Sequence, residues 1–315
     1  MNVSNVDRRE FLGAMAAATL FGVAGCTPYA GNGRSKGPQE PLFEISLAQW
    51  SHHKALFAGE LDTLSFVRAT RADYDLGAVE YVNAFFKDQV RDSKYLAALK
   101  QTADDHGVKS LLIMCDGLGQ LGDPDGARRT QAIENHRPWL EAAKSLDCHS
   151  IRVNAASGGS REDQVKLAAD GLRRLSEIGD SYGLNVIVEN HGGLSSDGAW
   201  LAKVMETVNH PRCGTLPDFG NFHVGNGQWY DRYRGVSELM PFAKAVSAKS
   251  HAFDAAGNET NTDYRRMLRI VLEAGYRGYV GIEFEGQDIP EKDGILATKA
   301  LLETVRAELA QSMAG

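Results

Sequence analysis

The sequence predicts one α/β domain folded as a (β/α)8 barrel, and three observations carry this prediction. Eight short apolar segments recur along the chain, segments with helical spacing separate them, and the last four apolar segments end on residues able to bind a divalent cation. Strands that alternate with helices form parallel sheets, and eight of them favour a closed barrel over an open doubly wound sheet. The predicted strands cover residues 42–50, 76–83, 110–116, 151–154, 186–189, 214–218, 246–251 and 279–283.

The first 26 residues are predicted to be an export signal and not part of the fold. Arg8 and Arg9 precede an Ala- and Gly-rich apolar run over residues 13–25, which is the order of regions in a signal peptide. The paired arginines are similar to a twin-arginine signal, with an ordinary secretory signal as the alternative. The run ends in a lipobox-like sequence at Cys26, so we expect a periplasmic or cell-envelope lipoprotein anchored only by lipid at Cys26.

A single barrel domain is predicted over residues 42–315. It follows a flexible tether over residues 27–41, which is rich in Gly, Pro, Ser and charged residues. The formal net charge of −7 gives no general attraction to phosphate backbones, so nucleic acid is not expected as a partner. Cys115, Cys148 and Cys213 lie in or beside apolar strands, which indicates buried free thiols.

Helical periodicity and glycine stops mark the segments between the predicted strands. Over residues 160–181, apolar residues recur at three- and four-residue steps. Ser160 supplies an N-cap signal and Gly183 a C-terminal stop. Gly107 and Gly275 precede two other strands in the same way, and the order of helix, glycine and strand is the αβ half of the repeat.

The last four predicted strands end on Glu189, Asp218, His251 and Glu283. These residues are 29, 33 and 32 positions apart, which leaves room for the roughly 30 residues of a βαβ unit. In a barrel, the C-terminal ends of the strands meet at the face that holds the active site. We therefore predict that the four side chains converge on one divalent metal ion. Three carboxylates and one imidazole favour Mn²⁺, Mg²⁺ or Co²⁺, and Zn²⁺ is also compatible.

Several segments resemble those of the xylose isomerase-like TIM-barrel superfamily, in its sugar isomerase, epimerase and inosose dehydratase branch. They are residues 188–191, 217–221, 249–254 and 281–286, and residues 76–80 resemble the motif on the second strand of these proteins. The resemblance implies a TIM barrel with one divalent metal held by Glu189, Asp218, His251 and Glu283. It also implies that Glu189 and Glu283 act as acid and base on a small carbohydrate.

The implied chemistry is removal of a proton next to a carbonyl group, with the metal polarising that carbonyl as a Lewis acid. The first hypothesis is an isomerase or epimerase of a free sugar or sugar derivative. The second is a lyase or hydratase acting on an oxidised sugar such as a 3-keto-glycoside. The third is a non-catalytic, lipid-anchored sugar-binding protein. Residues 117–122 are glycine-rich but lack the lysine of a phosphate loop, so phosphorylated sugars are not expected.

Other polar and aromatic residues near the strand ends are candidates for substrate binding. They are Glu80, His191, Asn221, Lys249 and Trp229. Lys249 and Arg152 lie within predicted strands, where an unpaired charge is costly. We therefore expect both to pair with carboxylates or with an anionic or polyol substrate.

One position departs from the family pattern. Many metal-rich relatives carry a histidine three residues after the sixth-strand aspartate, where this chain has Asn221. Endonuclease-type relatives use such histidines to hold several metal ions. We therefore expect a single metal ion, and nuclease activity is disfavoured.

Overall fold

The computed structural model describes residues 41–314, and the side chains of residues 41–313. The predicted signal peptide, Cys26 and nearly all of the predicted tether lie outside the described residues. The described part of the chain contains an eight-stranded parallel sheet in the order β6-β5-β4-β3-β2-β1-β10-β9. Its strands are β1 (Glu44–Ala48), β2 (Ala78–Val82), β3 (Lys109–Met114), β4 (Ser150–Val153), β5 (Asn185–Glu189), β6 (Cys213–Leu216), β9 (Val246–Ser250) and β10 (Tyr279–Phe284).

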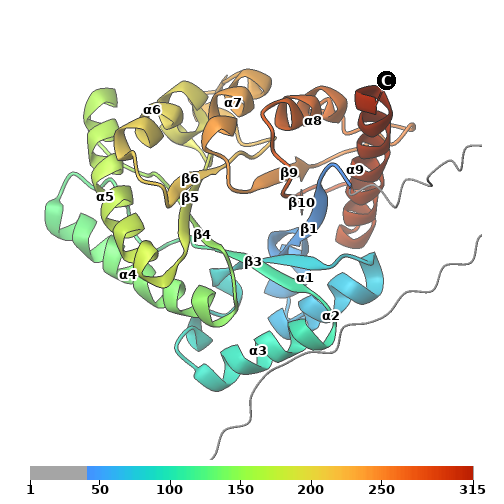
Figure 1. Ribbon diagram of the computed structural model, residues 1–315, viewed down its shortest axis with the longest axis horizontal. Helices are drawn as coiled ribbons and strands as arrows, with labels where there is room; N and C mark the ends of the chain where they lie inside the picture. The colour runs from blue at the N-terminus through green and yellow to red at the C-terminus, as the bar shows by residue number, and fades with distance from the viewer. Residues whose placement is uncertain (1–40, 315) are drawn as a thin grey trace, which may run out of the picture. The chain divides into compact units, whose positions relative to one another are not determined.

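Helices lie on the outer side of these strands (Figure 1). They are α1 (His53–Phe57), α2 (Thr63–Tyr74), α3 (Ser93–Asp105), α4 (Gly126–Ser145), α5 (Arg161–Tyr182), α6 (Gly198–Val208), α7 (Arg232–Leu239), α8 (Tyr264–Glu273) and α9 (Glu291–Ala314). Short 3-10 turns add η1 (Gln49–His52), η2 (Asn83–Phe85), η3 (Lys87–Gln89), η4 (Gly193–Ser196) and η5 (Met240–Phe242). Among residues 41–314, no helix combines the length and the apolar character needed to cross a membrane.

The two end strands of the sheet, β6 and β9, approach each other and close the ring. Parallel bridges join Thr215 to Ala243 and Asp218 to Ser247. The backbone N–H of Phe219 donates to the carbonyl oxygen of Ser247 at 3.0 Å. The (β/α)8 barrel prediction is therefore confirmed, and all eight predicted strands are present within a few residues of their expected ends.

Alternate residues of each strand pack on opposite sides of the ring, as the two-residue period of a strand requires. Leu47, Ile113 and Val188 belong to the large core between strands and helices. Their neighbours form a small apolar layer inside the ring, made of Ala48, Val82, Leu112, Met114, Ile187, Leu216 and Ala245. The polar residues of the candidate site share this inner side of the ring.

Local signals place the helix ends where the sequence predicts them. The hydroxyl of Ser160 accepts a hydrogen bond from the backbone N–H of Asp163 at the start of α5. Gly183 ends the helix with φ +73°, a conformation that glycine adopts without a steric penalty. The free thiols are also confirmed, because Cys115 and Cys148 are buried and Cys213 is partly buried.

The sequence prediction missed a short hairpin after β6. It consists of β7 (His223–Gly225) and β8 (Gln228–Trp229), which pair antiparallel. Asn226 and Gly227 connect them with positive φ values of 51° and 72°. An Asn-Gly pair is the strongest short-range signal for a two-residue hairpin loop, so the sequence did carry the information.

Candidate functional site

Three of the four predicted metal ligands meet at the C-terminal ends of their strands. Glu189 is the last residue of β5, Asp218 follows β6 and Glu283 lies near the end of β10. All three are buried, and one carboxylate oxygen from each lies within 4.8 Å of the others. We call these three residues the carboxylate group. This spacing alone could hold a metal ion.

Both oxygens of Glu189 face donors from the chain. Oε1 accepts a hydrogen bond from Nδ2 of Asn221 at 2.8 Å. Oε2 lies 2.8 Å from Nε of Arg152, in an ion pair that lacks the alignment of a hydrogen bond. Arg152 is only 4% exposed, and its Nη1 also donates to Oδ1 of Asp116 at 2.7 Å. The guanidinium therefore joins two carboxylates from the inner side of β4.

The carboxylate of Asp218 is held by backbone and hydroxyl donors. Oδ1 accepts the backbone N–H groups of Gly220 and Asn221 at 2.8 and 2.7 Å. The hydroxyl of Ser247 lies 2.7 Å from Oδ2 of Asp218 and 2.8 Å from Oε2 of Glu283. A hydroxyl carries one proton, so Ser247 links the two carboxyls through a shared donor.

Lys249 brings a second buried positive charge into the carboxylate group. Its Nζ lies 3.3 Å from Oε1 of Glu283 and 3.4 Å from Oε1 of Glu285, and its side chain is 3% exposed. Glu285 is held in turn by the indole Nε1 of Trp50, which donates to its Oε1. The prediction that Lys249 and Arg152 pair with carboxylates is confirmed.

His251, the fourth predicted ligand, is not brought to the carboxylate group. Its side chain is 41% exposed, and its Nε2 lies 3.9 Å from Oε2 of Glu285. Lys249 precedes it by two residues, so both side chains leave the strand on the same side. Lys249 therefore takes the inner position, on β9, and His251 takes the outer one, directly after the strand.

The remaining predicted substrate contacts are spread over the mouth of the barrel. His191 is exposed and lines a cavity of about 180 Å³ together with Asn154. Trp229 is 63% exposed, and its ring lies 5.2 Å from that of His223 across the β7–β8 hairpin. Asn221 touches Glu189, so it acts on the carboxylate group directly.

Sequence reasoning did not single out Ser247, Asp116 or Trp50 as site residues. Ser247 shares the inner side of β9 with Lys249, so the two-residue period could have found it. Asp116 and Trp50 follow their strands in the sequence, and only the packing shows which carboxylate or cation each one contacts.

The three carboxyls differ in acidity because their neighbours differ. Burial raises the pKa of Glu189 to about 8 against the opposing charge of Arg152. Burial also raises the pKa of Asp218 to about 6, although Lys249 opposes it. Burial alone would raise the pKa of Glu283, but the ammonium of Lys249 and the hydrogen bond from Ser247 outweigh it, so this pKa is lowered. When neighbouring carboxyls have different pKa values, one can act as the acid and another as the base.

Glu80, another predicted substrate contact, is fully enclosed inside the ring. Its Oε1 accepts a hydrogen bond from the hydroxyl of Ser46 at 2.6 Å, and its Oε2 is buried without a hydrogen-bond partner among residues 41–314. Gly281 on β10 leaves the space for it, because a Cβ there would lie 2.5 Å from Oε1 of Glu80. Burial raises the pKa of Glu80 from 4.5 to about 7.

The raised pKa of Glu80 predicts a pH-dependent stability. Below pH 4.5 the carboxyl is neutral in both states, whereas above pH 7 the folded protein must hold a buried charge, so stability falls as the pH rises through this range. Relative to Glu80→Gln, the wild type should lose up to about 3 kcal/mol of unfolding free energy between pH 4.5 and 8, measured by urea denaturation. Exposed Glu44→Gln is the control and should keep the wild-type profile. A pH-independent difference between wild type and Glu80→Gln would contradict this prediction.

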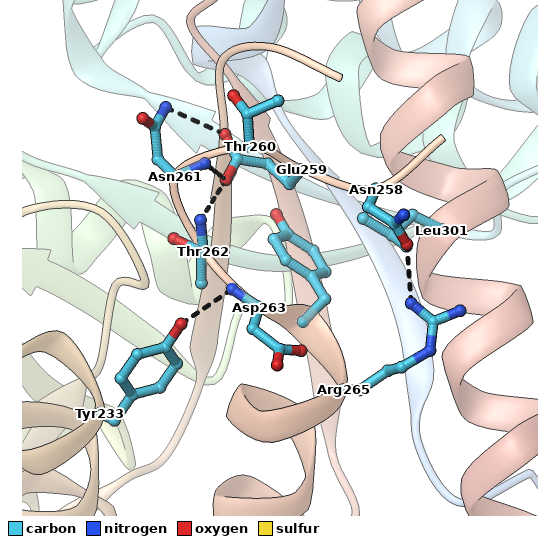
Figure 2. A pocket seen from close by; sticks show the side chains of 10 residues that line it. Tyr233, Asn258, Glu259, Thr260, Asn261, Thr262, Asp263, Arg265 and Leu301 are labelled. Carbon is cyan, nitrogen blue, oxygen red and sulfur yellow. Dashed lines mark hydrogen bonds between the residues drawn. The ribbon is translucent and has the colours of Figure 1, made fainter. Parts of the chain in front are cut away.

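A larger cavity of about 460 Å³ lies beside the loop between β9 and α8 (Figure 2). Within this loop the carboxylate of Glu259 accepts the backbone N–H groups of Asn261 and Thr262. The phenol oxygen of Tyr233 accepts the backbone N–H of Asp263 at 2.9 Å. The residues of the carboxylate group do not line this cavity, so we assign its polar contacts to shaping the loop.

Comparisons with known proteins agree with this fold. The 3-keto-D-glucoside 4-epimerase of E. coli, in its apo form, is 15% identical with a TM-score of 0.62, over 77% of this chain and 94% of that one. The IolI protein with a bound zinc atom is 15% identical with a TM-score of 0.65, over 84% of this chain and 99% of that one. At such identities the likeness shows the fold alone.

A short stretch also matches a curated relative. Over 61 residues the chain is 39% identical to the C-glycoside deglycosidase alpha subunit of Arthrobacter globiformis, which covers 18% of this chain and 17% of that protein. The family model described as xylose isomerase-like TIM barrel matches residues 68–305, which is more than half of the chain. The chain belongs to the xylose isomerase-like TIM barrel family.

Proposed function

We propose that this protein is an enzyme that removes a proton from the carbon next to a carbonyl group of a sugar or sugar derivative. The observation that carries the proposal is the carboxylate group itself, in which Glu189 and Glu283 reach one buried polar centre from strands three places apart in the ring. Each of the two has its own cation, Arg152 for Glu189 and Lys249 for Glu283. Two carboxyls in different surroundings can remove a proton and return it.

We assign the base to Glu283 and the second acid-base group to Glu189. Glu283 contacts both an ammonium and a hydroxyl, which favour its ionised form. Glu189 is enclosed by Arg152 and Asn221, which fix the direction of its carboxyl. General acid-base catalysis of this kind contributes about 10²- to 10⁴-fold to a rate.

Isomerisation or epimerisation is the first choice of reaction, because both need proton transfers at this site and no leaving group. A solved structure with the same fold is named as a 3-keto-D-glucoside 4-epimerase. The second choice is a lyase or hydratase acting on an oxidised sugar such as a 3-keto-glycoside. The local similarity to a C-glycoside deglycosidase alpha subunit favours this alternative. Both reactions begin with the same proton removal.

A divalent metal ion is not included in this proposal. The spacing of the three carboxylates would suit one, and a solved structure with the same fold holds zinc. However, His251 lies outside the carboxylate group, and Lys249 and Arg152 place two positive charges within it. The donor set of this chain therefore does not fit a divalent cation, and the acid-base steps are assigned to side chains alone.

We also propose that the enzyme acts after export, as a lipoprotein of the cell envelope. The support is the paired Arg8 and Arg9 followed by an apolar run that ends at Cys26. Mass spectrometry of the membrane fraction should find a mature N-terminus at a lipid-modified Cys26. An intact N-terminus carrying Met1 in that fraction would contradict this part of the proposal.

Hydrogen-deuterium exchange tests the proposed reaction directly. The purified protein is incubated in D₂O with a panel of free sugars and 3-keto-sugars, and the products are followed by NMR. We expect deuterium on the carbon next to a carbonyl group, with or without a net change of configuration. Loss of a substituent together with exchange would identify the lyase. Binding of a sugar without any exchange would reject the enzyme and support the sugar-binding hypothesis.

A further inference from the structure

We propose that the ammonium group of Lys249 takes the place of a metal ion in this site and is the group that polarises the carbonyl of the substrate. The assignment rests on the proposed function for its chemistry. The arrangement of charges around Lys249 does not depend on the proposed function. Three observations support it: the position of Lys249 on β9, the contacts of the carboxylate oxygens and the packing that holds the lysine side chain.

The position of Lys249 follows from the strand period. Ser247, Lys249 and His251 share one side of β9 and its end. Ser247 reaches Asp218 and Glu283 at the inner end of this row, and the imidazole of His251 lies 3.9 Å from the part-exposed Glu285 at the outer end. Lys249 lies between them, so an ammonium and not the predicted imidazole contacts Glu283.

Each of the six oxygens of the carboxylate group lies 2.7–3.3 Å from a polar group of the chain, and Oε2 of Glu189 makes its contact as an ion pair without a hydrogen bond. Those of Glu189 face Asn221 and Arg152. Oδ1 of Asp218 accepts the backbone N–H groups of Gly220 and Asn221. Oδ2 of Asp218 and Oε2 of Glu283 share the hydroxyl of Ser247. Oε1 of Glu283 faces the ammonium of Lys249. A divalent cation bound to Glu189 and Glu283 would lie close to the guanidinium of Arg152 and the ammonium of Lys249, which repel it.

Packing and ion pairs hold the side chain of Lys249 in one position. Its stem passes Gly220, where an added Cβ would lie 3.0 Å from both Cγ and Cδ of the lysine. Its ammonium is placed by Glu283 and Glu285, and Glu285 is itself held by the indole of Trp50. Packing and ion pairs together fix the charge at one point inside the ring.

This geometry leaves Lys249 able to act on a substrate. An ammonium has three N–H donors, and Glu283 and Glu285 form two ion pairs with it, at 3.3 and 3.4 Å. The third can donate to the carbonyl oxygen of a sugar. When Glu283 takes the proton, the electron pair of the C–H bond moves toward that oxygen, and the ammonium stabilises the negative charge that develops there. Glu283 can return the proton to the face it came from or pass it to an eliminated group, and Glu189 can deliver a proton to the opposite face.

Metal binding tests the assignment without reference to activity. Wild type, Lys249→Met and Lys249→His are freed of metal with EDTA and titrated with MnCl₂ and, separately, ZnCl₂ by calorimetry, with thermal unfolding followed in parallel. We expect no stoichiometric binding and no rise in Tm for the wild type. Removal of the charge should open the carboxylate group, so at least one variant should bind about one ion per chain and gain thermal stability from it.

The matched control is Lys203→Met, which removes an exposed lysine on α6 and should behave as the wild type does. One tightly bound ion per chain in the wild type would overturn the assignment, and this measurement needs no variant to fold. If neither the wild type nor any folded variant binds an ion, then the charge of Lys249 does not cause the exclusion of the metal. That result would also overturn the assignment.

Deuterium exchange then separates this inference from the proposed function. Exchange by the wild type should persist in EDTA, and Lys249→Met should lose about 10²- to 10³-fold, the usual cost of removing one donor to a developing oxyanion. Exchange that disappears in EDTA and returns with metal would reject the role of Lys249 while keeping the function. Absence of exchange under all conditions would reject the proposed function. The metal-binding measurement would then still test whether Lys249 excludes a metal ion.

Discussion

Replacing Glu283 with glutamine should reduce deuterium exchange by about 10²- to 10⁴-fold while leaving the barrel folded and able to bind its ligand. Glutamine has the shape of glutamate: its single oxygen can face Lys249, and its amide NH2 can donate to the hydroxyl oxygen of Ser247, which still donates to Asp218. It cannot take a proton from carbon. The loss should therefore fall on the exchange rate, and ligand affinity measured by calorimetry should change little.

The matched control for this variant is Glu285→Gln. Glu285 lies two residues further along the same side of the strand and also contacts Lys249, but it is partly exposed. Its replacement should cost far less exchange than the replacement of Glu283. Equal losses in the two variants would show that the base has been assigned to the wrong carboxylate. Full exchange in Glu283→Gln would remove Glu283 from the mechanism altogether.

Replacing Arg152 with methionine should destabilise the protein by about 3–5 kcal/mol, because it leaves buried carboxylates without their cation. Arg152 lies between Glu189 and Asp116, at 2.8 and 2.7 Å. Glu189 is fully buried and cannot recover the lost interaction from water. Urea denaturation of wild type and variant at pH 9, above the pKa of Glu189, gives the difference.

Two further variants identify the cause of that loss. Adding Glu189→Gln to Arg152→Met removes the stranded charge, so the double variant should recover part of the stability. Arg128→Met removes a cation whose side chain is 67% exposed, and exposed ion pairs contribute little to stability, so this variant should stay close to the wild type. A loss below about 1 kcal/mol in Arg152→Met would contradict the role given to this ion pair.

The barrel could be predicted from the sequence because its signals are local. Short apolar runs, helical spacing and glycine stops are set by a few neighbouring residues, and they recur eight times. The signal for the hairpin after β6 was equally local, with Asn226 and Gly227 at its turn.

The sequence predicted three residues of the candidate site correctly and misplaced the fourth, His251, and strand geometry explains why. Glu189, Asp218 and Glu283 each follow an apolar run, and parallel strands bring such ends to one face. On the strand that ends at His251, two residues of the same side compete for the centre, because Lys249 and His251 are separated by one full strand period. Sequence spacing predicts that both side chains lie on the same side of the strand. It does not predict which of them reaches the buried centre of the barrel.

The pairing of charges also depends on contacts distant in the sequence. Trp50 reaches Glu285 across 235 positions, and Ser247 reaches Asp218 across 29. Such contacts form only when the first strand meets the last one and β9 closes against β6. Periodicity along the chain contains no information about which of these partners meet.

The sequence by itself determined the eight-stranded barrel, the strand ends that carry Glu189, Asp218 and Glu283, and the need for Lys249 and Arg152 to be paired, because each follows from periodicity or from the cost of an unpaired buried charge. Only the tertiary structure decided that an ammonium and not an imidazole stands beside the three carboxylates. The depth of a side chain inside a closed ring is set by how all eight strands pack together, and no single segment encodes it.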